Sequence, residues 1–106
     1  MGKLDVIHGH EFGKSVFSPV NPARGYFNRA KSSVLAGHCH QTSEHHENNL
    51  KRDSMACFTT GALCNLSPKY SPFAFTKWNL GFADVEIEDD GQFIVNNYRI
   101  IDGKAR

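Results

Sequence analysis

Short apolar runs, separated by polar and glycine-rich segments, dominate the first half of the chain. Residues 4–7 form the first run and residues 33–36 the second. A helix from residue 23 to about 32 is predicted between them, because Asn21 can cap its first turn and Pro22 suits its first position. Two short strands joined through a helix form a βαβ unit, which we expect over about residues 4–40.

The second half of the chain has the pattern of antiparallel strands. Residues 55–60 suit a buried strand, and residues 82–88 alternate apolar with acidic positions, as a strand with one wet face does. Asp90-Gly91 is a strong two-residue hairpin signal, after which residues 93–101 return as a strand. We therefore expect antiparallel strands over about residues 55–101 and an α/β fold with more strand than helix.

Composition and charge narrow the classes of partner. The chain has 106 residues, 40% of them apolar, and a formal net charge of +1, which suits one folded domain. A net charge this close to zero does not favour binding to nucleic acid by neutralising its phosphates, so nucleic acid is expected only as a substrate. No apolar run approaches the roughly 20 residues of a membrane helix, and the start lacks the apolar segment of a signal peptide. The three cysteines are an odd number without a disulfide spacing, which indicates reduced thiols and a cytoplasmic location.

Two His-x-His triplets are the strongest chemical signal in the sequence. They are His8-Gly9-His10 and His38-Cys39-His40, and each follows a predicted strand. Chemistry in open α/β sheets gathers at the carboxyl ends of the strands, and imidazole is the commonest ligand of borderline transition metals. We therefore expect the triplets to build a metal site, with Gly37 permitting a sharp turn of the backbone.

The residues Gly37-His38-Cys39-His40 match the G-H-x-H motif of the calcineurin-like metallophosphoesterases. Residues 6–10, Val-Ile-His-Gly-His, look like the strand-end histidine motif that precedes it in that family. The resemblance covers the chain but only the C-terminal half of such an enzyme, since the earlier motifs D-x-H, G-D and G-N-H have no counterpart here. It implies a single partial domain over 1–106, half of an α/β/β/α sandwich.

The resemblance also implies an activity and a set of ligands. The intact enzyme would hydrolyse phosphate mono- or diesters with two divalent ions such as Mn, Fe or Zn. His8 and His38 would ligate one ion and His40 the other. Because the bridging carboxylate is missing, we expect the isolated chain to be inactive and to need the N-terminal half or a self-associated copy as its partner.

Four further side chains are candidates for supporting the metal or the substrate. His10 would neighbour the ligands, and Arg24 near the helix start could bind a phosphate bidentately or be a solvated helix charge. Glu44 and His45 lie in the polar segment 41–53, which we expect to be a loop. They could orient metal-bound imidazoles, or simply belong to a polar surface.

Two other functions are compatible with the same residues. The chain could be a non-catalytic binding or scaffold module that kept the strand-end histidines, or a small autonomous metal-binding protein. The phosphoesterase hypothesis further predicts an exposed strand edge where the missing half would pack, since strands of parallel sheets are normally flanked by partners.

Overall fold

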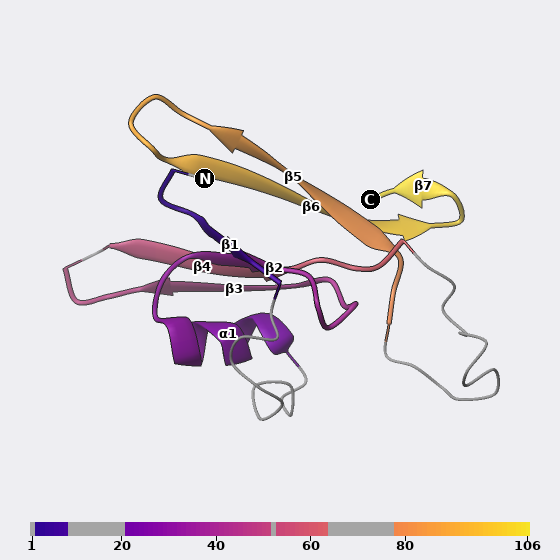
Figure 1. Ribbon diagram of the computed structural model, residues 1–106, viewed down its shortest axis with the longest axis horizontal. Coiled ribbons are helices and arrows are strands. Elements are labelled where there is room, and N and C mark those ends of the chain that lie inside the picture. The colour runs from indigo at the N-terminus through magenta and orange to yellow at the C-terminus, as the bar shows by residue number, and fades with distance from the viewer. Residues whose placement is uncertain (1, 9–20, 52, 64–77) are drawn as a thin grey trace.

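The computed structural model describes residues 2–8, 21–51, 53–63 and 78–106 (Figure 1). These residues form β1 (Asp5–Ile7), α1 (Pro22–Ala30), β2 (Val34–Ala36), β3 (Ser43–Asn48), β4 (Ser54–Thr59), β5 (Gly81–Ile87), β6 (Phe93–Ile101) and β7 (Lys104–Ala105). The expected α/β class, with more strand than helix, is confirmed. In this part of the chain, no helix has both the length and the apolar character that crossing a lipid bilayer demands.

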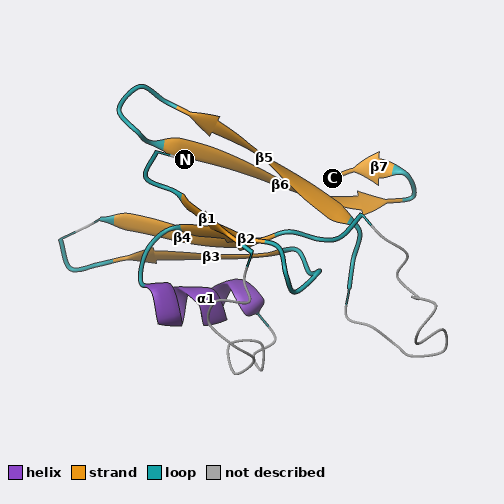
Figure 2. Ribbon diagram, in the orientation of Figure 1, coloured by secondary structure: helices purple, strands orange, loops and turns teal. Residues whose placement is uncertain are grey.

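The strands form two sheets, and α1 covers one face of the first. The first sheet has the order β1-β2-β4-β3, with β1, β2 and β4 parallel and β3 antiparallel to β4. The second sheet, β5-β6-β7, is antiparallel and lies on the face opposite α1 (Figure 2). In the register, Ile7, Ala36 and Thr59 are neighbours across the three parallel strands. The chain segments that follow these residues therefore leave the sheet side by side, at the carboxyl ends of the three parallel strands.

Two expectations for the middle of the chain are wrong. The polar segment 41–53 is not a loop throughout, because β3 lies within it and pairs with β4 over six residues. The strand over residues 55–60 belongs to the first sheet, as a parallel neighbour of β2, and not to the later antiparallel strands. The reason is that β4 is a central strand whose backbone needs partners on both sides, and this requirement overrides the polar composition of β3.

The C-terminal hairpin follows the predicted alternation. β5 and β6 pair from Gly81–Arg99 to Ile87–Phe93, with Asp84 and Glu86 exposed. The connection is one residue longer than expected. The amide of Glu88 donates to the Gln92 carbonyl at 2.8 Å, which leaves three residues between them. Gly91, the last of the three, has a φ of 88°, the left-handed conformation of a three-residue turn.

The helix has the cap that the sequence predicts. The amide of Arg24 donates to the Asn21 side-chain oxygen at 3.3 Å, and the amide of Ala23 donates to the Ser43 hydroxyl at 3.1 Å. Both are first-turn donors without a partner inside the helix, so β3 completes the capping of α1. The helix ends slightly earlier than expected, because Lys31 takes a left-handed φ of 55°.

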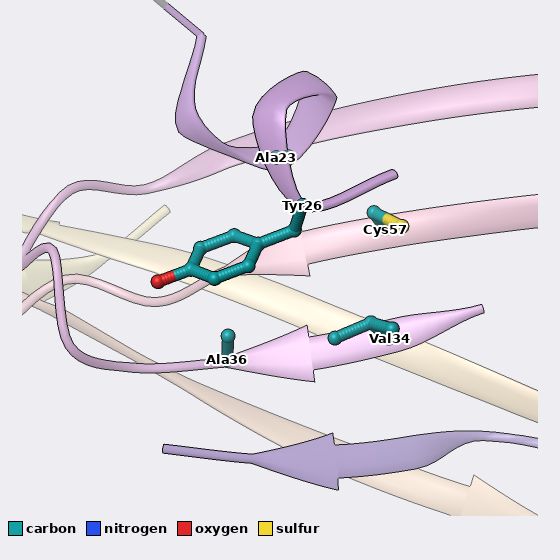
Figure 3. Packing of buried hydrophobic residues seen from close by; sticks show 5 residues of the cluster. All are labelled: Ala23, Tyr26, Val34, Ala36 and Cys57. Carbon is teal, nitrogen blue, oxygen red and sulfur yellow. The ribbon is translucent and has the colours of Figure 1, made fainter. Parts of the chain in front are cut away.

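The hydrophobic core lies between α1 and the first sheet. It consists of Ala23, Tyr26, Val34, Ala36 and Cys57 (Figure 3). Tyr26 is fully buried and has the largest volume among the fully buried side chains of the described residues. The three sheet residues of this cluster face α1 because they share the same parity along β2 and β4.

Burial raises the pKa of the Cys57 thiol to about 11, and a backbone hydrogen bond with Val34 opposes this rise only partly. A cysteine in an unfolded chain ionises at a pH of about 8.5. Between these two values the unfolded chain has lost a proton that the folded chain keeps, so the free energy of unfolding falls as the pH rises. Urea unfolding of the wild type should therefore lose more stability between pH 8 and 10.5 than that of Cys57→Ser. An identical pH dependence would contradict this assignment.

Candidate functional site

A pocket of about 440 Å³ lies at the carboxyl ends of the three parallel strands. The described residues that line it are Ile7, His8, Gly37, His38, His40, Thr60, Gly61, Ala62 and Leu63. We call it the histidine pocket. His8 follows β1, Gly37 follows β2 and Thr60 follows β4, so the parallel register brings these segments to one edge. This is the position at which open α/β sheets carry their binding sites.

Backbone hydrogen bonds hold two of the histidines next to each other. The amides of Gly37 and His38 both donate to the carbonyl oxygen of His8, at 3.2 and 2.8 Å. The ring centroids of His8 and His38 are consequently 4.8 Å apart, with an angle of 57° between the ring planes. Both residues are exposed, so the rings are accessible from solvent.

His40 borders the same pocket but has a different environment. Its amide donates to the Gly37 carbonyl at 3.1 Å, which closes a turn, and its own φ is 59°. Its ring stacks on Trp78 with a centroid distance of 4.5 Å and an interplanar angle of 28°. The backbone thus turns between Gly37 and His40, but the left-handed conformation is that of His40, and Gly37 does not have a positive φ.

The histidine pocket offers fewer metal-binding side chains than a two-metal centre requires. His8 and His38 offer two neighbouring imidazoles, which are suitable donors for Zn or a similar ion. Across the described ranges, no group of three or more His, Cys, Asp or Glu side chains is placed to hold a metal ion. The described lining of the pocket also contains no carboxylate. These residues alone therefore do not fit two divalent ions.

The predicted supporting residues lie away from the histidine pocket, as far as the structure describes them. Glu44 and His45 are on β3, which is at the opposite edge of the first sheet from β1. Arg24 is exposed on α1. None of the three is among the described lining residues, and His10 is outside the described ranges.

Glu44 and His45 instead make contacts along β3. The Nε2 atom of His45 is 2.9 Å from Oε1 of Glu47, and its ring lies 5.3 Å from the ring of Phe27 on α1. Glu44 faces the other side of the sheet, where its Oε2 is 3.4 Å from Nε2 of His46. The alternation of side chains along a strand separates these two pairs.

Three residues at the site were not predicted to belong to it. Thr60 and Gly61 line the pocket, and Trp78 supports the ring of His40. A signal for the first two exists, because Thr60 ends a predicted strand and Gly61 directly follows it. They are missed because that strand was expected to be antiparallel, and only a parallel neighbour of β2 ends at the same edge.

A parallel β-bridge between Ala62 and Leu80 lies beside the pocket, which Ala62 itself lines. The amide of Ala62 donates to the carbonyl of Asn79 at 2.8 Å, and the amide of Gly81 donates to the carbonyl of Ala62 at 3.0 Å. This bridge connects the end of β4 to the start of β5.

Comparison of the chain with protein-family models, with curated proteins and with solved structures found no match. The histidine pocket and the motifs that form it are therefore the basis for inferring a function.

Proposed function

We propose that this chain supplies imidazole ligands to a metal-dependent phosphoesterase of the calcineurin-like type. The observation that carries the proposal is the pair of exposed rings of His8 and His38, 4.8 Å apart at the ends of adjacent parallel strands. The G-H-x-H motif of residues 37–40 supports it. The layer order of one helix and two sheets is compatible with half of an α/β/β/α sandwich.

The proposal requires further ligands from another polypeptide, either an N-terminal half or a second copy. β1 supports this part, because among the described strands it has a partner on one side only. Val6, in the middle of β1, is 51% exposed. An unpaired strand edge with an apolar side chain is a ready template for another strand. A strand added there would lie beside His8, at the edge of the histidine pocket.

The substrate of the assembled enzyme would be a phosphate mono- or diester, and the ions would be Mn, Fe, Zn or similar. In this chain, His8 and His38 would hold one ion, while His40 would have to exchange its stacking on Trp78 for a role as ligand of the other. We propose the cytoplasm as the compartment, because Cys39 and Cys57 are free thiols.

A non-catalytic metal-binding or scaffold module is the second candidate. One observation favours it, namely that the described lining of the histidine pocket holds neither a carboxylate nor a lysine or arginine. Such a lining can retain one ion on two imidazoles, but it offers no carboxylate to bridge two ions and no cation to bind a phosphate group. The two candidates share the first step, the binding of an ion by His8 and His38.

Calorimetric titration of the purified chain with Zn²⁺ tests that shared step. We expect one ion per chain, and we expect His38→Ala to weaken its binding by at least about tenfold, since even residues that only orient a ligand have effects of this size. His46→Ala is the matched control, because His46 is also exposed but lies on β3, away from the histidine pocket. The control should bind Zn²⁺ as the wild type does.

Turnover of chromogenic phosphate mono- and diesters in the same samples, with Mn²⁺ present, separates the two candidates. We expect little or no turnover by the chain alone and a gain when the complementary polypeptide is added. If His38→Ala binds Zn²⁺ as tightly as the wild type, both candidates fail. If binding is normal but no complementing polypeptide produces turnover, only the module remains.

A further inference from the structure

A second cleft lies between the two sheets, lined on one side by residues of β3 and β4 and on the other by Gln92 and residues of β6. The sheets are tied together by Asn97, whose side-chain nitrogen donates to the Thr59 carbonyl at 3.0 Å and to the Ser43 carbonyl at 3.4 Å. The space has a volume of about 430 Å³, within the range of small-molecule sites. We call it the inter-sheet cleft.

The lining of the inter-sheet cleft combines polar residues, most of them on β3, with an apolar and aromatic part. Ala56 and Phe58 contribute from β4, and Phe93 and Val95 contribute from β6. The two β6 residues face the first sheet because they have the same parity as Asn97, whose amide reaches that sheet. Aromatic rings make favourable contacts with an aromatic ligand.

The rim of the cleft carries a negative charge. The side chain of Glu44 is 45% exposed, and its Oε2 atom is 3.4 Å from Nε2 of His46. The ring of His46 in turn meets the edge of Phe58, with centroids 5.7 Å apart. No described lining residue is a lysine or arginine. A carboxylate beside the aromatic side chains of the same cleft is complementary to a cation on an aromatic body.

We propose that the inter-sheet cleft binds a small aromatic amine. The ammonium group pairs with the carboxylate of Glu44, and the ring lies against Phe58 and Phe93. The cleft shares no described lining residue with the histidine pocket. The proposal is therefore independent of the proposed function, and either can fail without the other.

Nuclear magnetic resonance titrations of the full ¹⁵N-labelled chain test this site with tryptamine as the probe. Tryptophol, which has the same ring and a hydroxyl group in place of the ammonium group, is the neutral comparison. We expect amide shifts in β3, β4 and the start of β6, with tryptamine bound about fivefold more tightly than tryptophol, as a partly exposed ion pair provides. Glu44→Gln should abolish this preference.

Glu86→Gln is the matched control, because Glu86 is an exposed carboxylate on β5 that faces away from the cleft. It should retain the fivefold preference. Three results would overturn the proposal: equal affinity of the wild type for the two probes, a preference that persists in Glu44→Gln, or no saturable shifts in β3, β4 and β6 at millimolar tryptamine. Shifts centred on His8 and His38 would likewise assign the amine to the histidine pocket and overturn it.

Discussion

Replacing Tyr26 with alanine is expected to lower the free energy of unfolding by about 3–5 kcal/mol, the usual cost of truncating a buried aromatic side chain. Tyr26 is fully buried between α1 and the first sheet, in contact with the cluster that includes Val34 and Cys57. The truncation leaves a cavity that the short strand β2 cannot collapse to fill. Domains of this size have a total stability of about 5–15 kcal/mol, so much of it depends on this ring.

Urea unfolding followed by circular dichroism measures this loss. Leu50→Ala is the control, because the side chain of Leu50 is 100% exposed and its removal should change the free energy of unfolding by less than about 0.5 kcal/mol. A loss below about 1 kcal/mol for Tyr26→Ala would show that α1 does not form the core with the first sheet.

The second large effect is expected at Gly61, where alanine should destabilise the fold by about 2–3 kcal/mol. A Cβ atom at this position would lie 2.6 Å from the carbonyl oxygen of Asn79 and 2.7 Å from the amide nitrogen of Gly81. Both are backbone atoms of the Ala62–Leu80 bridge that connects the two sheets, so neither can move without breaking its hydrogen bond to Ala62. The strain should also disturb the amide resonances of His8 and His38 across the pocket.

Gly37→Ala is the matched control on the opposite wall of the histidine pocket. A Cβ atom there would meet only the Thr60 hydroxyl oxygen, at an ordinary 3.7 Å, and Gly37 does not have a positive φ. Alanine should therefore be neutral or slightly stabilising, because it restricts the unfolded chain. Thermal unfolding of the two variants side by side is the measurement. Equal unfolding temperatures of the two variants would show that the backbone around Gly61 is not tightly packed.

The elements that the sequence predicts correctly are those whose determinants lie close together in the chain. The start of α1 follows from Asn21 and Pro22, which cap the first turn of that same helix. The β5–β6 hairpin follows from the alternation around Asp84 and from Gly91, whose left-handed conformation closes the turn. Such signals are visible in the sequence because they need no distant partner.

The structure of β3 and β4, in the middle of the chain, depends instead on segments that are distant in the sequence. The polar residues of β3 carry no strand pattern, and they become a strand because the backbone of β4 needs a neighbour on that side. β4 itself has the composition of a buried strand, but composition does not distinguish a parallel from an antiparallel neighbour. Its parallel pairing with β2 is determined only by the packing of the sheet.

The candidate site, too, was predictable from the sequence only in part. The sequence alone was enough to predict that His8 and His38 follow neighbouring strands, since each triplet ends a recognisable apolar run. The placement of Thr60 and Gly61 beside them, the stacking of His40 on Trp78, and the removal of Glu44 and His45 to the far edge required the tertiary structure. The physical reason is that local patterns determine where a strand ends, whereas the order and direction of strands are determined by backbone hydrogen bonds and core packing between segments far apart in the chain.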